Sequence, residues 1–249
     1  RSAKLDLAGT RLTFGKLLNG GQLCLSPDYV VVPNELEEQL IARVVHEAQS
    51  MYPNITENED YAGVINERHF ARLQNYIDDA VAKGAKLTIV GADKTRVSED
   101  NRRMPLHILQ NVNEDMLVMH EEIFGPILPV MTYSDVAEVP DMIEPRRNPL
   151  AMYYFGKDKR EQEYLLSHVQ SGGVCINDIT LHYVQEDLPF GGVGASGMGA
   201  YHGPEGFRSL SHARAIYSQT MIDVLPIIGA RPPFGEKFRK NISKILGPI

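Results

Sequence analysis

The 249-residue sequence is poor in cysteine and has fewer basic than acidic residues. Its two cysteines, Cys24 and Cys175, are too few for a disulfide framework, which favours a reducing compartment such as the cytoplasm. The net charge of -7 gives an acidic surface that repels phosphate backbones. Nucleic acid is therefore not an expected partner.

Long apolar runs and clustered metal ligands are also missing from the sequence. No segment approaches the roughly 18 consecutive apolar residues of a membrane-spanning helix, so no membrane anchor is expected. No group of His and Cys residues has the spacing of metal ligands, so no metal site is expected. The hydrophobic share of 43% is that of an ordinary globular protein.

Strand-like and helix-like segments alternate along most of the chain. A helix is predicted after Asn34, with Asn34 as its N-cap and Glu37 as the capping-box partner. Further helices are predicted at 66–83 and 157–169, and strands at 28–33, 86–90, 105–111, 116–119, 127–132, 151–155 and 173–177. The alternation predicts an α/β domain over residues 1–210, with a mainly parallel sheet and flanking helices.

Two segments depart from this alternation. Residues 93–103 are charged and predict a loop or a hairpin. Residues 213–218 read as a late strand after the last helix, followed by a proline-rich tail. A strand in this position can pair outside its own domain, so residues 211–249 are interpreted as an oligomerisation strand and a C-terminal tail.

Cys24 ends the turn-like segment Asn19-Gly20-Gly21-Gln22-Leu23-Cys24. Its glycines permit positive φ and a close backbone approach. A cysteine on such a turn can present its sulfur and its own N–H to one substrate atom, which combines a nucleophile with part of an oxyanion hole. The alternative is that Cys24 is a small buried apolar residue, as most free cysteines are. Cys175, within an apolar strand, fits that alternative.

Four segments resemble motifs of the aldehyde dehydrogenase superfamily, in the order and with the approximate spacing of that family. They are Asn19 to Cys24, Glu121-Glu122-Ile123-Phe124-Gly125-Pro126, Asn148-Pro149-Leu150-Ala151, and Pro189-Phe190-Gly191-Gly192 continuing to Gly199. The runs Cys24 to Tyr29, Gly199 to Gly203, Ser211-His212 and Arg231 to Phe234 are similar to the class 3 branch, which includes fatty-aldehyde and coniferyl-aldehyde enzymes. The resemblance identifies the catalytic, C-terminal half of such an enzyme.

The resemblance implies oxidation of a small-molecule aldehyde, with a coniferyl-like aromatic aldehyde as the favoured substrate. The Cys24 thiolate would form a thiohemiacetal, NAD or NADP would take the hydride, and water would hydrolyse the resulting thioester to the acid. Glu122 would bind the nicotinamide ribose hydroxyls, and Phe124 would pack beside them. A homodimer is also expected, since association through the late strand can coexist with catalysis.

Other residues keep two interpretations each. Glu122 can instead solvate a turn, and Phe190 can line the aldehyde pocket or fill the core. Asn177 can hydrogen-bond the catalytic loop, although a structural role is favoured. Asn19, Gly21 and Gln22 are expected to shape the cysteine loop, and Gly191 and Gly192 to shape the turn after Phe190.

The family's N-terminal, cofactor-binding half has no counterpart in the sequence, and neither has its Glu-Leu-Gly-Gly motif, whose Glu is the general base. The chain is therefore expected to be a fragment that is inactive alone. Two alternatives remain: a cofactor-independent thiol esterase or acyl transferase that uses Cys24, and a non-catalytic oligomerisation module.

Overall fold

The computed structural model describes residues 1–91, 102–146 and 148–247, which divide into two compact units, 1–210 and 211–249. The helices are α1 (Leu5–Leu17), α2 (Glu37–Met51), α3 (Glu67–Ala82), α4 (Val139–Ile143), α5 (Lys159–His168), α6 (Gly203–Ser209), α7 (Val224–Ile227) and α8 (Glu236–Leu246). The strands are β1 (Val30–Pro33), β2 (Lys86–Val90), β3 (Leu106–Gln110), β4 (Ile127–Tyr133), β5 (Ala151–Tyr154) and β6 (Gly173–Ile176).

The first unit contains two sheets. The larger has the strand order β1-β4-β3-β2, in which β4 is parallel to both β1 and β3 while β2 is antiparallel to β3. The smaller sheet pairs β5 and β6 in parallel, with Met152 opposite Val174. The predicted α/β fold with a mainly parallel sheet is confirmed.

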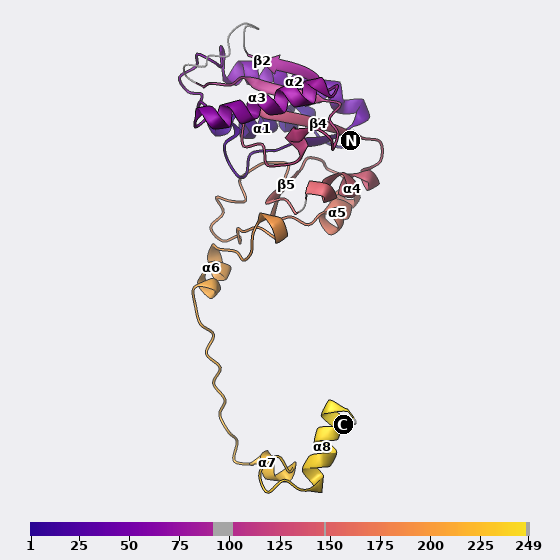
Figure 1. Cartoon of the computed structure of the whole chain (residues 1–249), viewed down its shortest axis with the longest axis vertical. Coiled ribbons are helices and arrows are strands. Elements are labelled where there is room, and N and C mark those ends of the chain that lie inside the picture. The colour runs from indigo at the N-terminus through magenta and orange to yellow at the C-terminus, as the bar shows by residue number, and fades with distance from the viewer. Residues whose placement is uncertain (92–101, 147, 248–249) are drawn as a thin grey trace. The chain divides into compact units, whose positions relative to one another are not determined.

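Helices cover both faces of the larger sheet (Figure 1). On β3, Leu106 and Ile108 pack in a cluster with α1 and α2, whereas Leu109 packs in a second cluster with α3. The alternation follows from the two-residue period of a strand, which sends successive side chains to opposite faces. Because both faces of β3 are buried, all five of its residues are buried.

Two local predictions were wrong. Residues 116–119 are not a strand, because Leu117–Met119 form a 3-10 turn whose first N–H donates to Asp79 Oδ2 of α3 at 2.8 Å. Asn34 does not cap a helix, because its side-chain amide donates to Ser134 Oγ at 2.8 Å. Residues 34–36 form a 3-10 turn instead, and α2 begins only at Glu37.

Helix α1 was not predicted. Its buried residues Ala8, Gly9, Leu12, Thr13 and Lys16 lie on one helical face, but three of the five are a glycine, a threonine and a lysine. Because this buried face is not apolar, α1 lacks the amphipathic pattern by which surface helices are recognised. Its C-terminal end leads directly into the cysteine loop.

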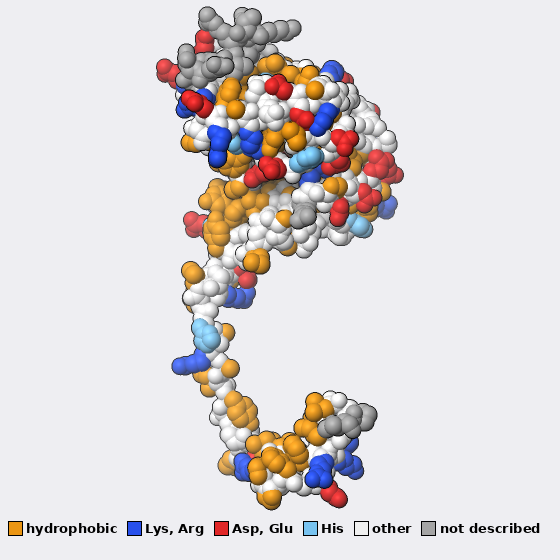
Figure 2. Space-filling model, in the orientation of Figure 1, with side chains coloured by type: hydrophobic (Ala, Val, Ile, Leu, Met, Phe, Trp, Pro, Cys, Tyr) orange, Lys and Arg blue, Asp and Glu red, His pale blue; other side chains and the backbone are white. Residues whose placement is uncertain are grey.

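The second unit contains α7 and α8 and exposes many of its apolar side chains (Figure 2). Residues 213–218 take no regular structure within the single chain, so the late strand, which needs an outside partner, stays a prediction. Of the predicted 93–103 loop, residues 93–101 lie outside the described residues. No helix in the described part of the chain has the length and apolar character needed to cross a bilayer.

Candidate active site

A left-handed turn joins α1 to the cysteine loop. Asn19, Gly20 and Gly21 have φ values of 52°, 62° and 74°. Asparagine and glycine are the residues that enter this region at least cost. The Asn19 side chain donates to the Gln22 carbonyl at 3.2 Å, and the Gln22 N–H donates to the Asn19 carbonyl at 3.2 Å. The turn is thus closed by its own residues.

The Gln22 side chain fixes this turn to the segment that precedes α3. Its amide nitrogen donates to the carbonyls of Asn19 at 2.9 Å and Gly63 at 3.1 Å, and its amide oxygen accepts from the Ile65 N–H at 2.8 Å. Gln22 is buried, and both ends of its amide are satisfied. These contacts give Gln22 a scaffolding position and leave it no free group for a substrate.

Gly21 brings the cysteine loop against the 121–126 motif. A Cβ at Gly21 would lie 2.5 Å from the Gly125 carbonyl oxygen and 3.0 Å from that of Lys16. A Cβ at Gly125 would in turn lie 2.5 Å from Leu73 of α3. Only glycines permit this stacking of backbone on backbone, so the two sequence motifs are in direct contact.

Cys24 is exposed, whereas Cys175 is buried in β6. Cys24 lines a cleft of about 620 Å³ in the first unit, which is also lined by Glu122, Tyr153 and Ser196. Tyr153 of β5 donates to the Leu25 carbonyl at 2.8 Å and so holds the residue after the cysteine. The alternative that Cys24 is a small buried apolar residue is therefore wrong.

Glu122 lies at this cleft, and none of the described residues donates a hydrogen bond to its carboxylate. Burial and then the negative charge of Asp28 raise the pKa of Glu122, while Arg72 and Lys16 oppose the rise. Phe124 has a φ of 51°, and its ring meets that of His69 edge-on at 6.4 Å between centroids.

Behind Glu122 lies a buried cation that sequence reasoning missed. The Lys16 side chain is 1% exposed, and its Nζ has no hydrogen-bond partner among the described residues. Burial lowers the pKa of Lys16 to about 8, and the charges of Asp28 and Glu122 oppose the fall. Burial also raises the pKa of Asp28, against Lys16 and against a 3.0 Å hydrogen bond from the Ile123 N–H.

The Asn177 side chain contacts the smaller sheet and not the cysteine loop. Its side chain accepts from the Gly156 N–H at 2.8 Å and donates to the Gly156 carbonyl at 3.0 Å. These two bonds tie the end of β6 to the residues after β5. Both ends of the amide are occupied there, so the contact with the catalytic loop, considered from the sequence, is not made.

Phe190 belongs to an aromatic cluster. Its backbone pairs with that of Tyr201 through two hydrogen bonds of 2.9 Å, and its ring lies 4.9 Å from that of Tyr183 and 5.6 Å from that of Tyr201. Burial, Tyr183 and then the nearby charge of Cys24 raise the pKa of Tyr201. Phe190 itself is buried, while Tyr183 and Tyr201 are partly open to solvent.

Gly191 and Gly192 permit the chain to fold tightly after Phe190. A Cβ at Gly191 would lie 2.1 Å from the Gly199 carbonyl oxygen, and one at Gly192 would lie 2.1 Å from that of Ser196. Ser196 also lines the Cys24 cleft. The two glycines therefore act on backbone packing beside the cleft.

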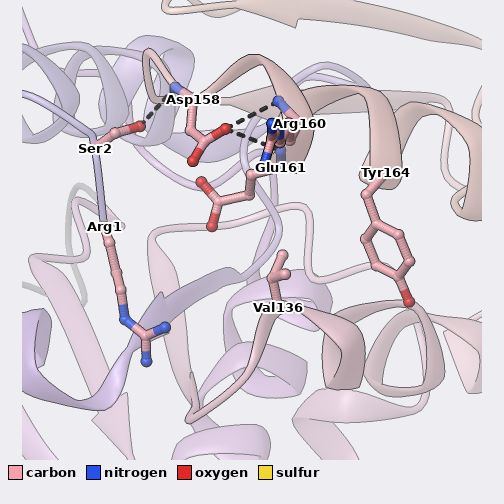
Figure 3. A pocket seen from close by; sticks show the side chains of 7 residues that line it. All are labelled: Arg1, Ser2, Val136, Asp158, Arg160, Glu161 and Tyr164. Atoms are coloured by element: carbon pink, nitrogen blue, oxygen red, sulfur yellow. Dashed lines mark hydrogen bonds between the residues drawn. The ribbon is translucent and has the colours of Figure 1, made fainter.

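A second cavity, of about 390 Å³, lies at the start of α5 (Figure 3). There Ser2 Oγ accepts hydrogen bonds from the N–H groups of Lys157 and Asp158, and Asp158 caps α5. None of the residues predicted for the site lines this cavity. The candidate site is therefore the Cys24 cleft.

Comparison with known families decides what this cleft belongs to. The aldehyde dehydrogenase family matches residues 1–216, which include the cysteine loop, the 121–126 motif and the Phe190 turn. The chain belongs to the aldehyde dehydrogenase family. The resemblance of the four sequence motifs is thereby confirmed.

Individual aldehyde dehydrogenases are similar over nearly the whole chain. A probable coniferyl aldehyde dehydrogenase of Caulobacter vibrioides is 43% identical over 98% of this chain and 50% of its own length, in agreement with the predicted class 3 and coniferyl branch. The substrate-bound AldH of Staphylococcus aureus has a TM-score of 0.81 at 33% identity, over 98% of this chain and 52% of that one. An NADP-dependent glyceraldehyde-3-phosphate dehydrogenase of Bacillus halodurans, complexed with NADP, has a TM-score of 0.75 at 27% identity, over 86% and 44%.

The chain spans about half the length of the curated relatives it matches. Three residues of the site were missed from the sequence: Lys16, Asp28 and Arg72. Lys16 gave no signal because the face that α1 buries is not apolar in sequence. Asp28 lies within a segment that resembles the class 3 branch, and Arg72 follows His69 by three residues on a predicted helix, so both could have been noted.

Proposed function

We propose that the protein carrying these residues oxidises an aldehyde to a carboxylic acid with NAD or NADP, and that Cys24 is the nucleophile. The observation that carries the proposal is an exposed cysteine on a glycine-built loop that packs against the Glu122 segment. In a cleft that also contains Glu122, one bound molecule can reach both groups.

Cys24 acts on the carbonyl carbon. Its thiolate adds to the aldehyde to form a thiohemiacetal, while its backbone N–H donates to the oxygen that becomes negative. A bound nicotinamide dinucleotide supplies a hydride acceptor. The acyl group is left on Cys24 as a thioester, and water releases it as the carboxylic acid.

Glu122 fits a role in holding the cofactor's ribose. Its solvent-exposed carboxylate receives no hydrogen bond from the described part of the chain, so both oxygens are free to accept from two hydroxyl groups. Lys16 and Arg72 favour its ionised form. Phe124, two residues after Glu122, supplies an apolar surface for the same ribose.

The aromatic cluster supports an aromatic substrate, as does the name of the Caulobacter vibrioides relative. The rings of Tyr183 and Tyr201 are partly exposed and can pack against a planar side chain, and Tyr201 is near enough to Cys24 to feel its charge. We expect the Tyr183→Ala variant to lose about fivefold in kcat/KM for cinnamaldehyde relative to hexanal, since an aromatic pair contributes on the order of 1 kcal/mol. The Tyr164→Ala variant of α5 is the matched control. Equal losses for both aldehydes would contradict an aromatic preference.

The test of the main proposal is aldehyde-dependent formation of reduced nicotinamide by the complete protein. Wild type should show it and Cys24→Ala should not, whereas Cys175→Ala should keep most of the activity. The 249 residues alone should reduce neither cofactor, because the chain spans only half of its relatives. Hydrolysis of p-nitrophenyl acetate by the complete protein without any cofactor reduction would favour the thiol esterase instead.

Two further expectations belong with this proposal. A homodimer is supported by the exposed Ile216 and Tyr217 of the 213–218 segment, which are 79% and 80% exposed. Light scattering should show a dimer that Ile216→Lys weakens, and a monomeric wild type would contradict this. The cytoplasmic location expected from the scarce cysteines stays a prediction.

A further inference from the structure

Two side chains of α3 hold the backbone of residues 122–124. Arg72 donates to the Glu122 carbonyl at 3.2 Å and also to the Ile123 carbonyl, and His69 lies 2.8 Å from the Phe124 carbonyl through its Nε2. Three successive carbonyls are thus bound by one helical turn. On the amide side, Asp28 accepts from the Ile123 N–H at 3.0 Å.

The orientation of Arg72 is itself fixed. Its guanidinium donates to Tyr76 Oη at 2.7 Å and lies 4.8 Å from the Tyr76 ring centroid, and Tyr76 in turn donates to Glu121 at 3.1 Å. Arg72 Nε donates to His69 Nδ1 at 3.3 Å. With Nδ1 as an acceptor, the His69 proton stands on Nε2, which is the tautomer that donates to the Phe124 carbonyl.

The conformation that these contacts hold is an unfavourable one. Phe124 has a φ of 51°, a region that an aromatic residue with a Cβ rarely enters. Such a conformation persists only where surrounding contacts over-determine it. Without the α3 contacts, the segment could relax at Phe124 and carry Glu122 away from its present place at the cleft.

We propose that Arg72, together with His69, is a positioning residue that sets Glu122 and Phe124 for the nicotinamide ribose by holding the carbonyls of residues 122–124. The inference rests on the proposed function, because it deepens the role of the same segment. Arg72 acts through the backbone, and its positive charge, like that of Lys16, opposes the rise in the pKa of Glu122. Neither Arg72 nor His69 needs to touch the substrate aldehyde.

The test compares four variants of the complete protein with wild type. Arg72→Gln removes the guanidinium that binds the Glu122 and Ile123 carbonyls, and His69→Leu removes the contact with the Phe124 carbonyl. His69→Gln keeps a side-chain N–H that can replace Nε2. Arg68→Gln is the matched control, since Arg68 is an exposed cation on the same helix. KM for NAD(P)+ and kcat are measured for each, with hydrogen exchange of the peptide covering residues 120–126.

We expect Arg72→Gln to raise KM for NAD(P)+ roughly tenfold or more while kcat changes less, since hydrogen bonds to a charged group commonly contribute at least that factor. Exchange in 120–126 should accelerate by a similar factor, with α2 unchanged. His69→Leu should show a smaller rise in KM that His69→Gln largely reverses. Arg68→Gln should match wild type.

Two results separate the inference from the proposed function. If wild type reduces the cofactor and Arg72→Gln keeps both its KM and its 120–126 exchange rate, the inference is wrong and the proposed function stands. If wild type reduces neither cofactor, the proposed function is wrong, and so is the role of Arg72 and His69 in positioning Glu122 for the ribose. A third result would also overturn the inference: Arg72→Gln loses hydrogen-exchange protection throughout the chain, and His69→Gln has the same KM as His69→Leu. Arg72 and His69 would then support overall stability and not the position of Glu122.

Discussion

The buried Lys16 predicts an unusual pH dependence of stability. In the folded chain its pKa is lowered to about 8 from the usual 10.5, with burial as the main cause. Between these two values the unfolded chain binds a proton that the folded chain does not. Stability must therefore rise with pH across this window, because the unfolded state loses that proton as pH increases.

The magnitude follows from the two pKa values. Between pH 7.5 and 9.5 the Lys16 contribution to the free energy of unfolding should increase by about 2 kcal/mol, at about 1.4 kcal/mol per pH unit for one proton. The Lys16→Met variant lacks this contribution but keeps a similar volume. We expect the stability difference, variant minus wild type, to fall by about 2 kcal/mol over that interval.

Urea unfolding of both proteins at several pH values between 7.5 and 9.5 measures the difference directly. Groups common to both chains cancel, and burial keeps Tyr61 and Tyr153 from titrating there because their pKa values are raised well above the window. A difference that is flat with pH would show that Lys16 titrates near its usual value. The claim of a buried ammonium behind Glu122 would then be refuted.

Three other predictions concern the cysteine loop. Iodoacetamide should modify Cys24 rapidly and Cys175 only on unfolding, as mass spectrometry of the native chain would show. Gly21→Ala should lower the free energy of unfolding by well over ~1 kcal/mol, because residue 21 has a positive φ and its new Cβ would lie 2.5 Å from a carbonyl oxygen. Gly84→Ala should lower it by about 1 kcal/mol, because residue 84 has a positive φ but open space around it. Tyr153→Phe, which removes the bond to the Leu25 carbonyl, should lower stability by about 1 kcal/mol in urea unfolding.

Local signals explain what could be predicted of the fold. Helix α3 was placed within about one residue at each end, because Asn66 accepts from the His69 N–H at its start and Gly84, with φ of 98°, follows its end. Strand β2 was predicted with its observed bounds. In these segments the apolar period and the turn residues agree, so neighbouring residues alone determine the element.

Distant contacts explain what could not be predicted. Residues 116–119 are apolar enough for a strand, but Asp79 of α3 binds their backbone and a 3-10 turn results. The Asn34 side chain is taken by Ser134, a residue far along the chain. The motif sequences identified the cysteine loop and the 121–126 segment separately, whereas the stacking of Gly21 on Gly125 appears only in the fold.

The features that a stable fold would avoid gather around this site. Lys16 is buried without a hydrogen-bond partner among the described residues, Phe124 has a positive φ, and Asp28 is a carboxylate whose pKa burial raises. An apolar residue at position 16 and a glycine at 124 would be easier to accommodate. Strain of this kind persists where surrounding contacts maintain it, and here Arg72 and Asp28 bind the carbonyl and the N–H of the peptide between Glu122 and Ile123. Because Gly21 meets the Gly125 carbonyl of the same 121–126 segment, Arg72→Gln and Gly21→Ala should be non-additive in activity. Each should add to the effect of a change at the distant Gly84.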